Sequence, residues 1–150
     1  MSVPLHFPVP SPRHPDDART AAIPAPRNPQ AVSLLAHAVR TLREAEGSTT
    51  PADRYSTAYL AAIRGSAAVL AMRGRPHRAR ARPASVWELL VRNAPELREW
   101  AAFFAAGSSR RAAVQAGASR LVDAATADDL VRRTGEFLQL VRRIVHGAGR

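Results

Sequence analysis

Apolar residues recur at three- and four-residue steps along most of the chain beyond residue 30, which is the spacing of amphipathic helices. No run of alternating apolar and polar residues is long enough to indicate a strand. The pattern predicts a first helix over residues 30–46, a long second helix over 51–72 and a long last helix over 127–146. Their apolar positions are Leu35, Ala38, Val39 and Leu42; Tyr55, Tyr59, Ile63, Ala67 and Leu70; and Leu130, Thr134, Phe137, Leu138, Val141, Ile144 and Val145. The sequence therefore predicts an all-α fold.

The stretch at residues 85–107, SVWELLVRNAPELREWAAFFAAG, holds both tryptophans and two of the four phenylalanines. Pro95 divides it into two apolar stripes, because proline interrupts a regular helix. The stripes are Val86, Leu89, Leu90 and Asn93, and then Leu97, Trp100, Ala101 and Phe104. We expect two short helices joined at a proline corner, and we expect this pair to be the central packing unit of an antiparallel helical bundle of about five helices.

Signals for helix starts and stops support these boundaries. Thr50, Pro51 and Asp53 form a capping box with proline at the first helical position. Thr126 and Asp129 have the spacing of a second capping box, which predicts the start of the last helix. The run Gly107-Ser108-Ser109 predicts a break, followed by a short helix over residues 110–116.

The first 29 residues differ in kind from the rest, since they carry eight of the twelve prolines. Proline supplies no amide donor and prevents a regular helix. We expect residues 1–29 to be a disordered, proline-rich tail and residues 30–150 to be the helical bundle domain.

The chain has a formal net charge of +10, and all of its 22 basic residues are arginines. Half of this excess lies in one acid-free segment at 73–82, which contains Arg73, Arg75, Arg78, Arg80 and Arg82. Arginine suits phosphate contacts, so the segment is a candidate binding site for RNA, another single-stranded nucleic acid or an acidic protein. A lysine-free composition is also typical of GC-rich coding, and the sequence alone leaves both explanations open.

The sequence offers little for catalysis or for a metal site. It contains no cysteine, which excludes disulfides and thiolate chemistry and is compatible with the cytoplasm, the compartment that we expect. The histidines have no metal-ligand spacing, and no glycine-rich phosphate loop or nucleophile motif is present. The apolar runs are too short to span a bilayer. We therefore expect no metal, no cofactor and no membrane anchor.

Several of these segments together resemble an actinobacterial branch of the HEPN (higher eukaryotes and prokaryotes nucleotide-binding) helical domains. The resemblance is carried by RY at 54–55, YL at 59–60, SVWELL at 85–90, PEL at 95–97 and WAAFFAAG at 100–107, and it covers about residues 30–147. It implies an antiparallel bundle that can form a homodimer. It also implies kinship with metal-independent ribonucleases and with partners of nucleotidyltransferases.

The chain departs from that family at the catalytic motif. Catalytic HEPN ribonucleases carry an arginine, four to six intervening residues and a histidine on a late helix. Here the only late histidine is His146, and Arg142 precedes it by one residue too few. The two residues still fall one helical turn apart on one face, so a degenerate catalytic pair stays open.

We favour a non-enzymatic binding domain that uses the arginines of segment 73–82. Two alternatives remain: a degenerate HEPN ribonuclease with Arg142 and His146, and a helix-turn-helix DNA-binding protein. The second alternative rests on residues 101–106, the Gly107-Ser108-Ser109 turn and the short helix that follows.

Overall fold

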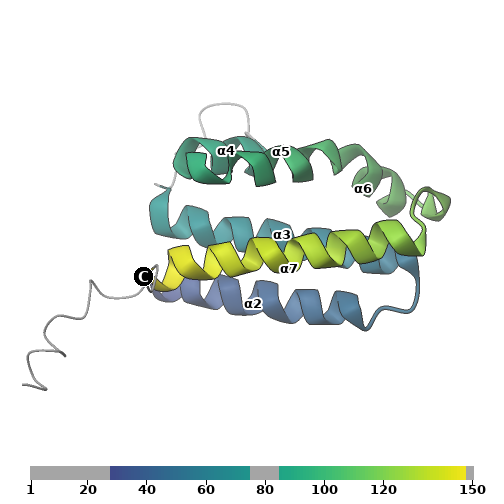
Figure 1. The fold of residues 1–150 in the computed structure, drawn as a ribbon, viewed down its shortest axis with the longest axis horizontal. Coiled ribbons are helices and arrows are strands. Elements are labelled where there is room, and N and C mark those ends of the chain that lie inside the picture. The colour runs from purple at the N-terminus through teal and green to yellow at the C-terminus, as the bar shows by residue number, and fades with distance from the viewer. Residues whose placement is uncertain (1–27, 75–84, 148–150) are drawn as a thin grey trace, which may run out of the picture.

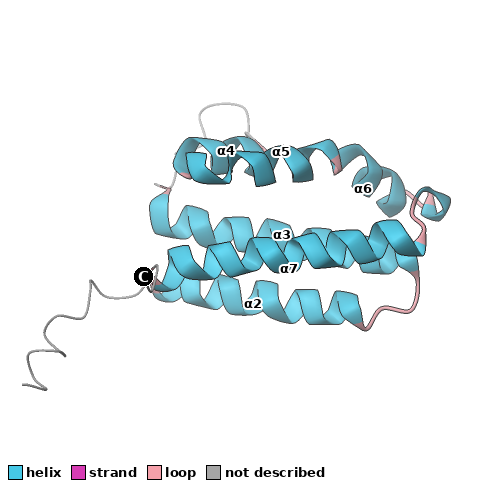
Figure 2. Cartoon of the chain, in the orientation of Figure 1, coloured by secondary structure: helices cyan, strands magenta, loops and turns pink. Residues whose placement is uncertain are grey.

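A computed structural model describes residues 28–74 and 85–147 of the chain. The long helices are α2 (Pro29–Glu46), α3 (Pro51–Arg73) and α7 (Ala124–His146). Between the last two lie α4 (Val86–Asn93), a 3-10 turn (Pro95–Leu97), α5 (Arg98–Ala106), α6 (Ser108–Gln115) and a second 3-10 turn (Ser119–Leu121). The described residues contain helices and loops but no strand, which confirms the all-α prediction (Figure 2).

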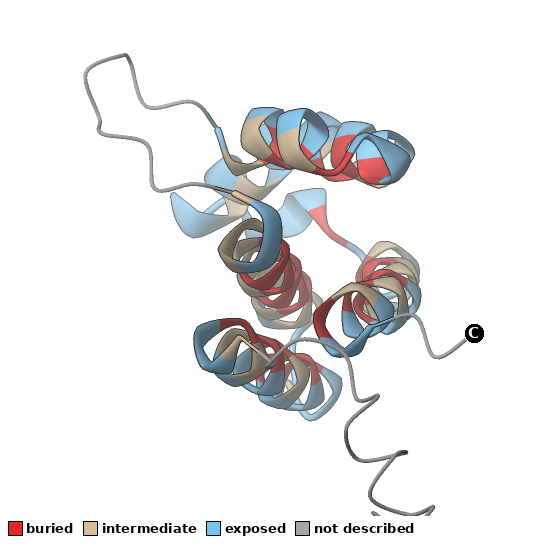
Figure 3. Ribbon diagram, turned by 90° about the vertical axis from the view of Figure 1, so that its left-hand side faces the viewer, coloured by how far each residue is buried: buried red, intermediate tan, exposed pale blue. Residues whose placement is uncertain are grey.

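The helices form two layers, and α3 is the helix of the first layer that makes most of the contacts with the second. The long helices α2, α3 and α7 pack side by side, and the chain α4–α5–α6 runs across the other side of α3 (Figure 1). The buried residues lie on the helix faces that are turned toward other helices, and the outward faces carry the exposed residues (Figure 3). The stripes predicted for the first and last helices lie in this core or at its edge. On α3, Tyr55, Tyr59 and Ile63 do so as well, but the predicted Ala67 and Leu70 are only half-buried, and Ala68 and Val69 are buried instead.

Small side chains allow α3 to approach its neighbours closely. Ala58, Ala61, Ala62 and Ala68 are fully buried along it, and Gly65 lies among them. A methyl group added at Gly65 would overlap the Cδ2 atom of Leu138 on α7. The contact between α3 and α7 therefore depends on a glycine at this position.

Side-chain caps set the starts of the long helices. Asn28 accepts a hydrogen bond from the Ala31 amide, so α2 begins at Pro29, one residue earlier than expected. Thr50 caps α3 as predicted, by accepting from the Asp53 amide at 3.2 Å.

The cap predicted for the last helix is wrong. Asp123 caps α7, and its Oδ1 atom accepts from the Thr126 amide at 2.8 Å. The helix consequently begins at Ala124, and Thr126 is already inside its first turn. The hydrogen bond from Thr126 also holds the pKa of the Asp123 carboxyl below its usual value. An aspartate three residues before an amide donor provides the same bond that the threonine was expected to provide.

Tyr59 joins α3 to the second layer through its hydroxyl group. The hydroxyl donates to the Phe104 carbonyl oxygen at 2.6 Å and accepts from the Trp87 indole nitrogen at 3.0 Å. Trp87 stacks on Phe104 with ring centroids 5.0 Å apart. Trp87 and Leu90 are the buried residues of α4, whereas Val86, Leu89 and Asn93 of the predicted stripe are only half-buried. The buried face of α4 therefore differs from the predicted one and points toward Tyr59 and Phe104, which form an aromatic cluster with Trp87.

The break between α5 and α6 is shorter than expected. Only Gly107 separates the two helices, and Ser108 and Ser109 belong to α6, which ends at Gln115. The three-residue turn that the helix-turn-helix alternative requires is thus not formed. A methyl group at Gly107 would lie 2.9 Å from the Tyr55 hydroxyl oxygen, so glycine permits the close approach of α5 to α3.

Two glycine substitutions test whether close packing, rather than helix propensity, decides stability. We expect Gly65→Ala to lower the free energy of unfolding by about 1 kcal/mol, because overpacking costs about 1–3 kcal/mol and exceeds the gain of about 1 kcal/mol in helix propensity. Gly135→Ala is the matched control on α7, because its new methyl group would meet only Leu42 at an ordinary 3.7 Å. We expect this variant to gain about 0.5–1 kcal/mol. Urea unfolding measures both changes, and stabilisation of both variants would contradict the tight contact between α3 and α7.

Candidate functional site

The arginine segment predicted as a binding site is only partly described. Arg73 ends α3, and its guanidinium group forms an ion pair with Glu96 at 2.6 Å. The hydrogen bond from Arg73 lowers the pKa of the Glu96 carboxyl. The other four residues, Arg75, Arg78, Arg80 and Arg82, lie outside the described residues. Helix α3, which Arg73 ends, ends at the same end of the bundle as α7 (Figure 1).

A basic groove runs between α2 and α7, with a volume of about 570 Å³. Its floor is aliphatic and is formed by Val32, Leu35, Val39, Leu42 and Leu138. Its rim is polar and exposed, and is formed by Arg40 and Arg43 from α2 and by Gln139, Arg142 and His146 from α7. No carboxylate and no phenylalanine, tyrosine or tryptophan is among the described residues that line this basic groove.

The arginines of the basic groove have no carboxylate partner among the described residues. Neither Arg40, Arg43 nor Arg142 forms an ion pair there. The carboxylates of α7 lie no further along it than Glu136 and are engaged elsewhere: Asp128 pairs with Arg54, Asp129 with Arg132 and Arg133, and Glu136 with Arg132. Beyond Glu136, the charged residues of α7 are all basic, which leaves the groove with a positive potential suited to phosphate groups.

Arg142 and His146 both line the basic groove, as their spacing of one helical turn predicted. Both side chains are exposed. His37 of α2 is exposed as well, but it is not among the residues that line the groove. An arginine and a histidine at the same face can together hold a phosphate group and exchange a proton with a neighbouring hydroxyl.

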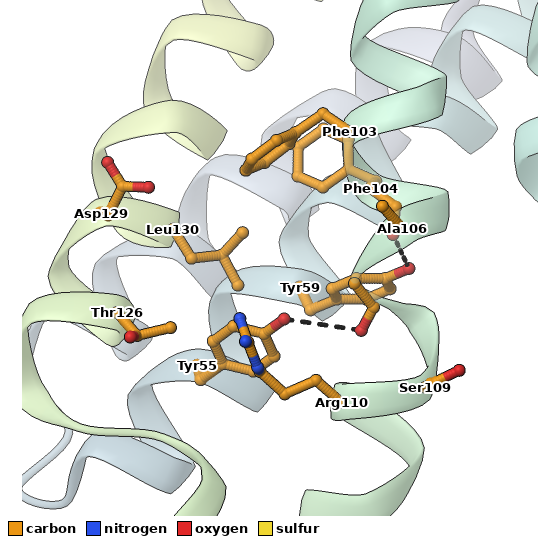
Figure 4. A pocket seen from close by; sticks show the side chains of 11 residues that line it. Tyr55, Tyr59, Phe103, Phe104, Ala106, Ser109, Arg110, Thr126, Asp129 and Leu130 are labelled. Carbon is orange, nitrogen blue, oxygen red and sulfur yellow. Dashed lines mark hydrogen bonds between the residues drawn. The ribbon is translucent and has the colours of Figure 1, made fainter.

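A second cavity lies between α3, the junction of α5 with α6, and the first turns of α7 (Figure 4). We call it the aromatic cavity; its volume is about 440 Å³. Its apolar lining includes Tyr55, Tyr59, Phe103, Phe104 and Leu130, and its polar lining includes Ser109, Arg110, Thr126 and Asp129. Beside it, the Arg111 guanidinium lies 5.1 Å from the centre of the Tyr59 ring. None of these residues was expected at a site.

Two general findings concern metal and membrane. Among residues 28–74 and 85–147, no group of histidines and carboxylates is arranged so that it could hold a metal ion. Within the same ranges, every helix is too short or too polar to cross a bilayer.

Comparison with known proteins gives one match. Residues 45–142 match the family model of SAV_6107-like HEPN domains, which is about two-thirds of the chain. The chain belongs to this HEPN family. The searches of curated proteins and of solved structures found no match. The match covers α3 to most of α7, and therefore both the aromatic cluster of this HEPN domain and Arg142.

The sequence revealed only half of the basic groove. Arg142 and His146 were recognised by their spacing on one helix, whereas Arg40 and Arg43 were not predicted as site residues. Their spacing of three residues beside the Leu35–Leu42 stripe was a usable signal. It became meaningful only when the structure placed α2 against α7.

Proposed function

We propose that this HEPN domain is a non-enzymatic binding domain for single-stranded RNA. The observation that carries the proposal is the basic groove, where three arginines without carboxylate partners among the described residues surround an aliphatic floor. Guanidinium groups of this kind contact phosphates through charge-assisted hydrogen bonds. The resemblance to HEPN domains, many of which are ribonucleases, favours RNA over DNA as the natural ligand.

The composition of the groove favours contacts with the RNA backbone over recognition of bases. Proteins that read single-stranded bases stack them on several aromatic side chains, and among the described lining of the basic groove the His146 imidazole is the one such ring, with no phenylalanine, tyrosine or tryptophan. Binding should therefore depend on phosphate contacts and vary little with sequence. The release of counterions makes such binding weaken steeply as salt concentration rises.

The arginines of segment 73–82 add a second source of phosphate contacts in this proposal. Arg75, Arg78, Arg80 and Arg82 have no acid between them in sequence, and their segment follows α3, which ends at the same end of the bundle as α7 (Figure 1). Arg73 contributes only if RNA displaces Glu96 from its ion pair.

Charge-matched variants test the proposal. We expect the triple variant Arg40→Gln, Arg43→Gln, Arg142→Gln to bind a short oligouridine more weakly and with a smaller salt dependence. Since each phosphate contact to a single strand contributes about 0.7 to the slope of log affinity against log salt, the slope should fall by about 2. Fluorescence anisotropy at several salt concentrations measures both quantities.

The control is the triple variant Arg92→Gln, Arg98→Gln, Arg120→Gln. It removes the same net charge from exposed arginines that do not line the groove. A third variant, with Arg75, Arg78, Arg80 and Arg82 changed to glutamine, measures how much segment 73–82 contributes to RNA affinity. Equal losses in the groove variant and the control would overturn the groove as the site. The absence of RNA binding by the unaltered protein would overturn the proposed function and leave an acidic protein as the partner to test.

A ribonuclease is the second candidate, because Arg142 and His146 line the same groove. In such an enzyme the His146 imidazole would take the proton from a ribose 2′-hydroxyl group as that oxygen attacks the neighbouring phosphorus. The bond from phosphorus to the 5′-oxygen would break, which gives a 2′,3′-cyclic phosphate and a 5′-hydroxyl group that takes its proton from water. The Arg142 guanidinium would stabilise the charge that develops on the phosphate oxygens. The shortened spacing of this pair relative to the catalytic HEPN motif is the reason that binding ranks first.

A cleavage assay distinguishes the two candidates. If the domain is a ribonuclease, His146→Ala should reduce the cleavage of oligouridine by about 100-fold or more, the usual contribution of a general acid–base group. His37→Ala is the control, because His37 is exposed on α2 outside the groove. Cleavage that persists unchanged in His146→Ala would come from a contaminant or another site. An RNA that binds without being cut supports the non-enzymatic function.

A further inference from the structure

The aromatic cavity contains an arginine whose charge is not compensated within it. Two charged residues line the cavity, Arg110 and Asp129. The oxygens of Asp129 already accept from Arg132 at 2.6 Å and from Arg133 at 3.1 Å, so this carboxylate is paired outside the cavity, although it shares Arg132 with Glu136. Arg110 forms no ion pair with any described residue, and Asp123, a described carboxylate on which its charge acts, does not line the cavity. The cavity therefore favours an anion.

The cavity also contains a buried hydroxyl group with a weak partner. Tyr55 is 3% exposed, and its hydroxyl oxygen lies 3.5 Å from the Gly107 carbonyl oxygen, its one hydrogen-bond partner among the described residues. Hydroxyl bonds to oxygen are usually about 2.7–2.8 Å long, so this contact leaves the donor poorly satisfied. Tyr59 differs, because its hydroxyl makes two good bonds and has no donor to spare. Figure 4 shows Tyr55 and Arg110 among the side chains that surround the cavity.

The rest of the lining suits an apolar body of small-molecule size. The rings of Tyr55 and Phe103 and the side chain of Leu130 form much of the wall. A volume of about 440 Å³ is within the range of small-molecule sites, which combine an apolar lining with a few convergent polar groups.

We propose that the aromatic cavity binds a small monocarboxylate with an apolar, aromatic or aliphatic, body. The carboxylate pairs with the Arg110 guanidinium and accepts a hydrogen bond from the Tyr55 hydroxyl, while the body packs against Phe103 and Leu130. This site is separate from the basic groove, and it does not depend on RNA binding.

Such a ligand would stabilise the packing of α6 against α3 and α7. Helix α6 has no buried residue, and Arg110 is on it. The ligand would link Arg110 to Tyr55 on α3 and to Leu130 on α7, elements that have a buried core of their own. Occupation of the cavity should therefore protect the backbone of α6 most.

The probe is 1-naphthaleneacetate, with its neutral amide as the matched ligand. Isothermal titration with the full chain should show that the acid binds more tightly than the amide. Arg110→Gln should weaken the binding of the acid by about 10- to 100-fold, the usual effect of removing a hydrogen bond to a charged group. It should leave the affinity for the amide unchanged. Arg110 is exposed, so this variant should fold, and circular dichroism checks that it does. Arg120→Gln is the control, because Arg120 is exposed and does not line the cavity.

Hydrogen exchange gives the second measurement. Saturating acid should slow the exchange of amides 108–115 in the unaltered protein but not in Arg110→Gln. Three results would overturn the proposal: no binding of the acid at millimolar concentration, equal affinities for acid and amide, or the same affinity in Arg110→Gln and Arg120→Gln. Binding without protection of α6 would place the ligand elsewhere and would also overturn it.

Discussion

The two-layer arrangement depends on the hydrogen bonds of the Tyr59 hydroxyl group, which connect α3 to the second layer. One phenol oxygen bonds both Trp87 on α4 and Phe104 on α5 from the middle of α3. Trp87 is buried, so its indole nitrogen would lose its hydrogen bond without compensation from water if the hydroxyl were absent, at a cost of about 1–3 kcal/mol. The buried Phe104 carbonyl would lose one of two bonds, because it also accepts from the Gly107 amide at 3.0 Å. Phe104 then contacts Phe137 at 5.2 Å between ring centroids, which connects the second layer to α7.

These hydrogen bonds explain where the two cavities of the bundle lie. They hold α4 and α5 over α3, and α6 continues from α5, so residues of α6 and of the first turns of α7 line the aromatic cavity. The side of α2 and α7 that faces away from α4 and α5 has no second layer among the described residues (Figure 3). The basic groove lies between α2 and α7. Charge on α7 follows the same division: carboxylates paired with arginines lie near its start, and Arg142, Arg143 and His146 lie near its end. Acidic residues toward the start of a helix and basic residues at its end interact favourably with the helix dipole. The basic residues at the end of α7 therefore both stabilise the helix and contribute to the positive potential beside the groove.

Local patterns predicted the helices well, because periodicity and caps are properties of neighbouring residues. Thr50 and Pro51 marked the start of α3, and Pro95 marked the corner between α4 and α5. The error at α7 arose because Asp123 and Thr126 both have side chains that can cap, and only the actual bond to the Thr126 amide distinguishes them. The stripe on α4 was misplaced because periodicity could not foresee that the Trp87 nitrogen would find the Tyr59 hydroxyl 28 residues away.

The sites depend on contacts between helices, and for that reason they were less predictable. The basic groove needs α2 beside α7, and the aromatic cavity needs α3, α6 and α7 together. Arg142 and His146 could be found because their relation is confined to one helix. Arg40, Arg43, Arg110 and Tyr55 gain significance only from neighbours that are distant in sequence.

The central claim is that RNA lies in the basic groove, and a two-dimensional nitrogen–proton NMR titration of the full chain with oligouridine tests it most directly. The account predicts that the amides of residues 32–43 and 135–146 shift in a saturable way, while those of α5 and α6 stay in place. Shifts confined to α5 and α6, or no shift in either half of the groove, would contradict it.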